Sequence, residues 1–235
     1  MKKDILFGII ILVIFAPFIV SSDIYSLFMQ VTAKHPYMMA FLKFAILATV
    51  GEVLGMRIKR GIYSYEGFGI VPRIIVWGLF GIFIAVGMKI FSVGAPAMVE
   101  SFGVDGVVES MKGELTPKRV LGAFATSVMM NSLFAPVFMT LHKITDTHIF
   151  NNNGSLKSLI TPIKMEQIIT SLDWKVQWGF VFKKTIPLFW IPAHTITFLL
   201  PQTSQVLFAA LLSIALGLIL SIASLLSRDR NNVKA

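Results

Sequence analysis

The chain has 235 residues, of which 55% are hydrophobic and 14% charged, and its formal net charge is +9. Soluble domains contain about 45–50% apolar and about 25% charged residues, so this composition excludes an ordinary soluble globular protein. The chain has no cysteine, which excludes a disulfide framework, a thiolate nucleophile and a cysteine-based metal site.

Apolar segments long enough to cross a bilayer recur along the chain. About 20 apolar residues are needed to span the roughly 30 Å of hydrocarbon in a membrane. Segments of about this length lie at residues 5–20, 38–56, 70–91, 120–141, 183–200 and 206–226. The sequence therefore predicts an all-α fold, a polytopic transmembrane bundle of about six helices.

Residues 1–37 are predicted to form an N-terminal membrane anchor helix followed by an outer loop. Lys2 and Lys3 precede a long apolar run that ends near Ser21 and Ser22. A basic start, an apolar core and small residues at the end are also typical of a cleaved signal peptide. Cleavage would leave five helices, and both interpretations stay open for this segment.

The second apolar segment carries a carboxylate beside a pair of small residues. Gly51 and Gly55 are four positions apart, a spacing that lets another helix backbone approach closely. Glu52 lies within the membrane, where an ionisable side chain costs about 2.5–3.5 kcal/mol on insertion scales. Lys43 lies on the opposite face of the same helix and near the outer headgroups, so the partner of Glu52 must come from another helix.

The third and fourth segments place their polar residues at different depths. Arg73 and Lys89 lie about 24 Å apart along the third helix, so they are expected to reach opposite headgroup layers. Asn131 lies at the middle of the fourth segment, one turn after Ser127 and one turn before Pro136, where a helix break is expected. A single Asn at this depth is either an interhelical hydrogen bond or a solute ligand.

Three residues of metal-ligating types follow the fourth segment. His142 and Asp146 would share a helix face, whereas His148 is turned away from them. A metal site here would therefore need a loop or a further ligand from elsewhere. We predict a solvated, capped helix end instead, and no metal or other cofactor.

The predicted bundle occupies residues 38–226 and includes one amphipathic segment outside the membrane. Apolar residues at 163–178 are spaced as in a short helix that also carries Lys164 and Lys175, a pattern typical of a helix lying on the cytoplasmic interface. A basic cytoplasmic tail at 227–235 follows the bundle.

The fifth segment is the least regular and the most polar at depth. His194 lies near the midplane, and Thr197 adds a hydroxyl nearby. Pro187 and Pro192 each remove a backbone donor and free a carbonyl within the helix. Water is therefore expected beside this segment, and His194 is either a satisfied structural residue or part of a solute path.

The last segment places small residues at every fourth position. On a helix, such residues form one narrow stripe against which another backbone packs closely. The stripe consists of Ala209, Ser213, Gly217 and Ser221. We predict that it is a packing face within the monomer, with a homo-oligomer contact as the alternative.

The distribution of Lys and Arg predicts the orientation. If the N-terminus is cytoplasmic, most of the 21 basic residues fall in inner loops and tails, and those that fall outside are Lys34, Lys112, Lys118 and Arg119. The positive-inside rule thus predicts cytoplasmic N- and C-termini in a multi-pass protein, which we expect in a bacterial cytoplasmic membrane. The basic charge then faces an anionic lipid leaflet, and no nucleic-acid partner is predicted.

Residues 190–201, which read WIPAHTITFLLP, resemble the signature of the Mpv-seventeen and twenty-two-kilodalton peroxisomal membrane protein family. Trp190 and Phe198 match that signature in register. His194 takes the place of the family's Gln and Thr197 that of its Asn. The family's Pro is displaced, and its final Arg is missing.

A weaker likeness to this family extends upstream. Glu52 with the preceding glycine resembles the family's Gly-Asp, and Asn131 with the Ala-Pro pair that follows resembles its Asp-Gln and Ala-Pro. The resemblance covers roughly residues 38–226 and indicates a divergent member with an added first helix, although the family has four membrane helices. It implies a channel-like protein linked to redox and metabolite homeostasis, with Glu52, Asn131 and His194 at matched polar positions.

Together these features predict a passive or gated pore for small polar solutes or ions. Glu52 would set a cation preference near the inner mouth, while Asn131, His194 and Thr197 would line the midplane. The alternative is a non-transporting structural or stress-response membrane protein whose polar residues only bond helices together. No enzyme is predicted: an intramembrane enzyme that uses His194 is the least favoured alternative, because no paired nucleophile lies at matching depth. The sequence also has no nucleophile elbow, phosphate loop or zinc-protease helix. The expected partners are the lipid bilayer and a small polar solute or ion.

Overall fold

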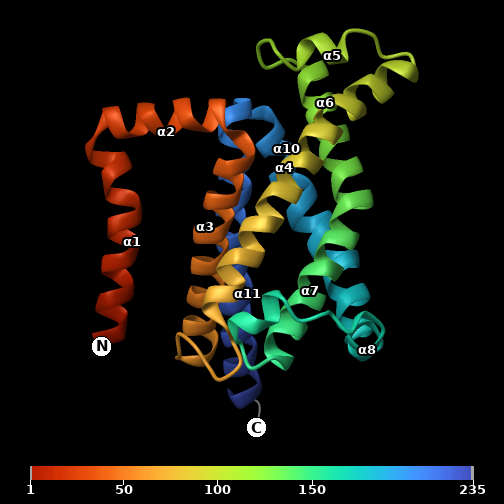
Figure 1. Cartoon of the computed structure of the whole chain (residues 1–235). Helices are drawn as coiled ribbons and strands as arrows, with labels where there is room; N and C mark the ends of the chain where they lie inside the picture. Colours follow the sequence, from red (N-terminus) through yellow and green to blue (C-terminus); the bar gives the residue numbers. More distant parts are fainter. Residues whose placement is uncertain (1, 234–235) are drawn as a thin grey trace.

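The computed structural model describes the backbone of residues 2–233 and the side chains of residues 2–219. All regular elements between residues 2 and 233 are helical, so the all-α prediction is confirmed (Figure 1). In chain order the elements are α1 (Lys2–Val20), α2 (Ser22–Lys34), α3 (Pro36–Arg60), α4 (Ile70–Ser101), α5 (Val107–Ser110), α6 (Pro117–Met129), η1 (Met130–Phe134), α7 (Ala135–Asn151), η2 (Leu156–Leu159), α8 (Met165–Ser171), α9 (Trp174–Val176), η3 (Gln177–Trp190), α10 (Ile191–Leu199) and α11 (Gln202–Val233).

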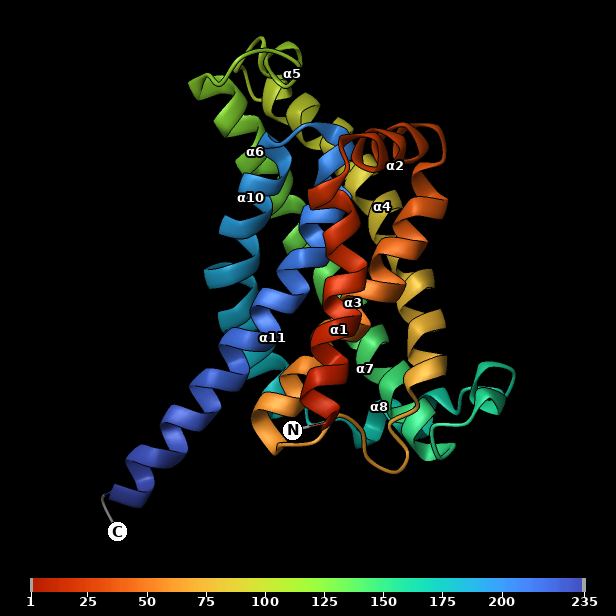
Figure 2. The ribbon, with the colours of Figure 1, turned by 90° about the vertical axis from the view of Figure 1, so that its left-hand side faces the viewer.

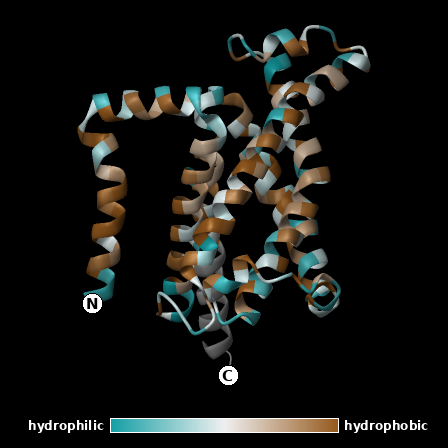
Figure 3. Cartoon of the chain, in the orientation of Figure 1, coloured by the Kyte–Doolittle hydropathy of each residue, from teal (hydrophilic) through white to brown (hydrophobic). Residues whose placement is uncertain are grey.

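Within residues 2–219, five helical segments are long and apolar enough to cross a membrane. They are α1, α3, α4, the continuous rod of α6, η1 and α7, and the first part of α11 up to Ile219. The chain is therefore a multi-pass integral membrane protein. Hydrophobic residues cover the long rods, while hydrophilic residues gather at their ends and in the loops (Figure 3).

The predicted span at 183–200 lies in a different kind of rod. α9, η3 and α10 follow one another without a loop, and this rod runs beside α6 and α7 (Figure 1). It does not reach the hydropathy of the other spans, because Lys183, Lys184 and His194 lie within it. Its polarity is therefore the reason that this rod stands apart from the five apolar segments.

The bundle is built on α3. Both α4 and α11 pack along α3, while α6 packs against α4 and α10. α1 buries no residue and lies over the side formed by α3 and α11 (Figure 2). The start of α1 and the end of α11 lie at the same end of the bundle, which we call the terminal end (Figure 1).

The outer loop expected before residue 37 is a helix in the structure. α2 lies across the end of the bundle opposite the terminal end (Figure 1). The hydroxyl of Ser21 accepts a hydrogen bond from the backbone N–H of Ile24, as expected for an N-cap. Lys43 of α3 is buried, and its Nζ donates to Thr32 Oγ1 at 3.1 Å. Lys43 therefore fastens α2 to α3 instead of extending to the headgroups as predicted.

Small residues bring α3, α4 and α11 close together. A Cβ on Gly51 would lie 3.1 Å from Ile214 of α11, and a Cβ on Gly217 would lie 3.5 Å from the Gly51 carbonyl oxygen. A Cβ on Gly81 of α4 would collide with the carbonyl oxygen of Ala40. The small-residue pattern predicted packing faces on α3 and α11, and in the structure these two faces approach each other. Ser221 of the same stripe lies outside the residues whose side chains are described.

Two long helical rods change their winding where prolines were predicted to break them. η1 is a π-helix that ends just before Pro136, and η3 is a π-helix that contains Pro187. α10 begins with Pro192 in its first turn. The backbone therefore stays helical through these prolines and shifts its hydrogen-bond register instead of breaking.

The amphipathic segment predicted at 163–178 is not one helix. α8 ends at Ser171, and the chain is extended at Leu172 before α9 begins. The carboxylate of Asp173 accepts a hydrogen bond from the Val176 N–H and caps this new start. A capping residue in the middle of the apolar pattern therefore divides it into the short helix α8 and the start of the rod formed by α9, η3 and α10.

Candidate functional site

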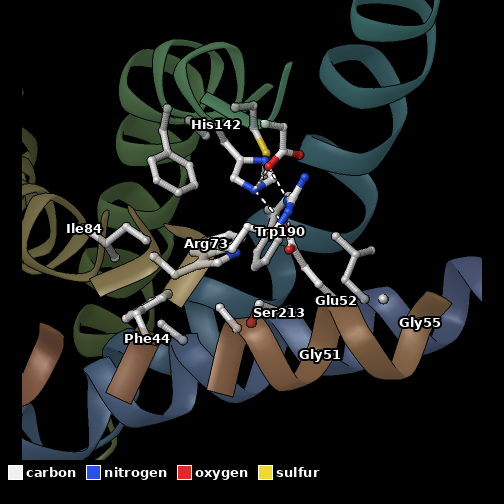
Figure 4. A pocket seen from close by; sticks show the side chains of 18 of the residues that line it. Phe44, Gly51, Glu52, Gly55, Arg73, Ile84, His142, Trp190 and Ser213 are labelled. Atoms are coloured by element: carbon white, nitrogen blue, oxygen red, sulfur yellow. Dashed lines mark hydrogen bonds and ion pairs between the residues drawn. The ribbon is translucent and has the colours of Figure 1, made fainter. Parts of the chain in front are cut away.

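A cavity of about 450 Å³ lies inside the bundle. It reaches from the exposed residues Lys59 and Arg60, at the terminal end of α3, to His194 and Asn131 in the middle of the bundle. Glu52 also lines it, so the cavity contains the acid, the amide and the imidazole that the sequence singled out from three different helices. Figure 4 shows part of its wall, with Glu52, Arg73 and His142 directed toward one another.

Arg73 is the centre of a charged cluster on the cavity wall. Its Nη1 donates to Glu52 Oε2 at 2.9 Å and also to Asp146 Oδ1. Its Nε donates to the Phe68 carbonyl at 2.8 Å, and its guanidinium lies 4.4 Å from the centre of the Phe68 ring. Only 6% of the Arg73 side chain is exposed, so the prediction that it extends to the headgroups is wrong.

His142 completes the cluster. Its Nε2 lies 3.2 Å from Glu52 Oε1 and 3.7 Å from Asp146 Oδ1. The imidazole also packs against Trp77, with 4.5 Å between the ring centres. Both oxygens of Glu52 therefore have a bonding partner, and these partners come from α4 and α7, which confirms that Glu52 is paired with other helices.

Loop geometry brings the cluster together from three helices. Glu52 lies two turns before the end of α3, Arg73 lies in the first turn of α4, and His142 and Asp146 are four residues apart on α7. Gly69 begins α4 with a φ of +67°, and a Cβ on it would lie 2.7 Å from the backbone of Gly154. Only glycine combines this left-handed backbone with so close an approach, so the contact fixes the start of α4 against the end of α7.

The cluster has the residue types of a metal site but already contains a cation. The ligand atoms of Glu52, His142 and Asp146 lie within 4.8 Å of one another. However, Nη1 of Arg73 bonds to both carboxylates, so a metal ion would compete with the guanidinium for the same oxygens. His148 does not join this group, because its Nε2 contacts the Ser158 carbonyl at 2.9 Å.

Sequence reasoning considered His142 and Asp146 but placed them in solvent. Sequence spacing does not reveal that Glu52 and Arg73 form ion pairs with these residues inside the bundle. The available signal was chemical: a carboxylate within a span needs a cation, and Arg73 is the basic residue nearest to the start of the next span. However, the depth of Arg73 along its helix also allows its side chain to extend to the headgroups, so depth did not distinguish the two arrangements.

Asn131 and His194 form a second polar pair deeper in the cavity. Asn131 Nδ2 donates to the Ser127 carbonyl at 2.9 Å and lies 3.1 Å from His194 Nδ1. Because a backbone carbonyl only accepts, the atom facing it is the amide nitrogen, and His194 Nδ1 must then accept from it. The hydrogen bonds thus assign the neutral Nε2–H form to His194.

The other polar residues predicted for the site have different surroundings. Thr197 is fully buried, does not line the cavity, and donates to the Ala193 carbonyl at 3.0 Å. By contrast, small residues that were predicted only as packing positions also form cavity wall. These are Gly51, Gly55, Ala209, Ser213 and Gly217.

No residue of α6 lines the cavity, and α6 packs against α4 and α10. Ala123, Thr126 and Ser127 of α6 are fully buried there. Ser127 Oγ donates to the Ile191 carbonyl at 2.7 Å, which ties α6 to the start of α10. The two π-helices η1 and η3 contact each other beside this closed region. The cavity is thus a vestibule that extends from the terminal end to the middle of the bundle.

Comparisons with known proteins give no match for this chain: no family model, no curated protein and no solved structure is similar to it. The likeness of residues 190–201 to the Mpv-seventeen family signature therefore stays a prediction. The function proposed for the site is argued from its geometry.

Proposed function

We propose that this protein is a channel-like membrane protein that passes small solutes through the vestibule. The observation that carries the proposal is that Glu52, Asn131 and His194, from three separate helices, line one cavity inside a membrane-spanning bundle. Polar residues at membrane depth are expensive unless they pair or face a water-filled path. A cavity that reaches exposed residues at one end supplies such a path.

The vestibule corresponds to a closed or one-sided state of a path across the membrane. Solute enters from the terminal end and meets the closed region where α6, α4 and α10 pack. Passage requires that this packing loosens. The π-helices η1 and η3 are the natural elements to move, because a π-to-α change of register rotates the side chains beyond it. The Asn131–His194 bond lies at this boundary.

The role that the sequence suggested for Glu52 changes in this proposal. Its two oxygens are bonded to Arg73 and His142, and the guanidinium compensates its charge, which weakens its attraction for a further cation. We propose instead that Glu52 and Asp146 position Arg73 on the vestibule wall. Their combined charge keeps a buried guanidinium tolerable in this location.

A non-transporting structural role is the second candidate function. The observation that favours it is that the polar groups at depth bond to one another, as in Asn131 with Ser127 and His194. Such bonds hold helices together in membranes without any solute. The two functions differ in whether water and solute reach the vestibule.

Cysteine accessibility tests the proposal directly, because the natural chain has no cysteine. Ser213 lines the vestibule, while Leu188 is 77% exposed on the outside of η3. In proteoliposomes, Ser213→Cys should react with a membrane-impermeant methanethiosulfonate added from the terminal side. Leu188→Cys should not react, because a thiolate does not form in hydrocarbon. An unreactive Ser213→Cys in a folded protein would favour the structural role.

Solute flux tests the second half of the proposal. Proteoliposomes should swell in small neutral solutes or conduct in planar bilayers, and His194→Phe should change that rate because it fills the end of the vestibule. Val86→Phe, on the exposed side of α4, is the matched control and should leave the rate unchanged. If neither swelling nor conductance is observed although Ser213→Cys reacts, the vestibule binds solute but does not conduct it.

A further inference from the structure

The vestibule combines an apolar interior with unengaged donors and cations. From this combination we infer that its solute is a compact aromatic carboxylate, an anion with a small apolar ring. The inference rests on the proposed function and deepens it by naming the class of solute. It replaces the expectation of a polar solute or a bare ion.

The interior of the vestibule suits an apolar ring. Aromatic and methionine side chains form part of its wall, including Phe44, Trp77, Met130, Phe138 and Met139. The volume of about 450 Å³ lies within the usual range of sites that enclose small organic molecules. Beside these apolar side chains a bare ion would lose its hydration without gaining ligands, whereas an apolar ring would not.

Most polar atoms of this wall that lack a partner among the described residues are donors; Oδ2 of Asp146 is an acceptor without one, but this carboxylate is already bonded to Arg73 through Oδ1. Glu52 has no unengaged oxygen, whereas His194 carries an Nε2–H that has no partner among the described residues. Lys59 lies at the mouth without a bonding partner among the described residues, and the guanidinium of Arg60 beside it lies over the ring of Tyr65. The vestibule therefore offers hydrogen-bond donors and positive charge to its solute.

Charge and burial together fix the direction of the solute. A carboxylate is best retained at the mouth, where Lys59 and Arg60 are exposed and water still solvates it. The ring then extends inward past Glu52 toward Trp77 and Phe138. Positive charge at the mouth also raises the local concentration of anions and speeds their entry.

Fluorescence quenching tests the inference on the full chain in nanodiscs of zwitterionic lipid. Trp77 and Trp190 line the vestibule, whereas Trp174 and Trp178 are exposed elsewhere and are replaced by Phe to remove their signal. The probes are 4-bromobenzoate, 4-bromobenzylamine and sodium bromide, which separate the ring, the charge and the halide. We expect saturable quenching by 4-bromobenzoate at a concentration at least about tenfold below that of the amine.

Charge removal at the mouth gives the matched test. The double variant Lys59→Gln/Arg60→Gln changes only exposed residues and should raise the half-saturating concentration of 4-bromobenzoate about five- to tenfold. Lys157→Gln, an exposed lysine outside the vestibule, should leave it unchanged. An equal effect of both variants would show that surface charge in general, and not the mouth, attracts the anion.

Three results would overturn the inference. They are quenching that never saturates, quenching by the amine at equal or lower concentration, and displacement of 4-bromobenzoate by dodecanoate at a much lower concentration than by benzoate. The last result would identify an acyl chain as the occupant. If the amine binds saturably and Ser213→Cys is reactive, only the assignment of the solute is wrong. If Ser213→Cys is unreactive, the proposed function is wrong as well.

Discussion

Arg73 and Glu52 form a salt bridge with 2.9 Å between Nη1 and Oε2, and this bridge joins the start of α4 to α3 inside the bundle. The same Nη1 bonds to Asp146 of α7, so one guanidinium connects three helices. Removal of one partner from a buried ion pair leaves an uncompensated charge, which destabilises proteins by about 3–5 kcal/mol. The stability of the fold and the shape of the vestibule wall therefore both depend on Arg73.

The cluster predicts an asymmetry between its cation and its carboxylates. Arg73→Gln leaves Glu52 and Asp146 close together without a guanidinium, whereas Glu52→Gln leaves the Arg73–Asp146 pair intact. We expect Arg73→Gln to lower the unfolding temperature clearly more than Glu52→Gln, by the equivalent of about 2 kcal/mol or more. Thermal unfolding in detergent measures this difference, and equal shifts for the two variants would contradict it.

The hydrogen bonds of Asn131 predict the tautomer of His194. Because Asn131 Nδ2 donates to the Ser127 carbonyl and to His194 Nδ1, the imidazole should be neutral with its proton on Nε2. Long-range ¹H–¹⁵N NMR distinguishes this form, with His194→Gln to assign the signal. Asn131→Leu should release the imidazole to a mixture of tautomers; a protonated His194 in the natural chain would refute the assignment.

Two glycines of α4 predict opposite effects of the same substitution. A Cβ at Gly81 would collide with the backbone carbonyl of Ala40, which cannot move aside, whereas a Cβ at Gly94 would meet nothing within 4 Å. We expect Gly81→Ala to separate α4 from α3 and to destabilise the fold by about 1–3 kcal/mol. Gly94→Ala should be neutral or stabilising by up to about 1 kcal/mol, since alanine favours the helix. Unfolding measurements on both variants test this difference.

A polar contact outside the bundle predicts the behaviour of α1. Asp4 Oδ1 accepts from Arg57 Nε at 2.6 Å and from the Tyr63 hydroxyl at 2.9 Å. Partial desolvation and the neighbouring Asp4 carboxylate raise the pKa of Tyr63 above its usual value of 10.0. The Tyr63 contact is therefore fully present below pH 10 and should be lost as pH rises through the raised pKa.

A spin label at Gly8→Cys measures this loss, because a side chain there would meet nothing within 4 Å. Label mobility on α1 should increase above about pH 10 in the natural background, as Tyr63 ionises. Tyr63→Phe should show the higher mobility already at neutral pH and no further step from this residue. An alkaline transition of equal size in Tyr63→Phe would show that α1 is held by other contacts.

The sequence predicted several of the polar residues inside the bundle, but it did not predict which of them bond to each other. The apolar length of the second span and the cost of a buried acid predicted that Glu52 needs a partner from another helix. The prediction that Arg73 extends to the headgroups used only its position along the third helix. The side of the helix on which Arg73 lies depends on how α4 is rotated against α3.

Segment length and hydropathy were enough to predict an all-α membrane protein, because they decide whether a segment is more stable in lipid than in water. The spacing of small residues also predicted packing faces on α3 and α11, but not that these two faces meet. Only the tertiary structure decided that Arg73, Glu52, His142 and Asp146 meet and that one cavity reaches from them to His194. These contacts depend on how each helix is rotated, on the close approach at Gly69 and on the π-helical register. Each of these arises from contacts between segments far apart in the chain.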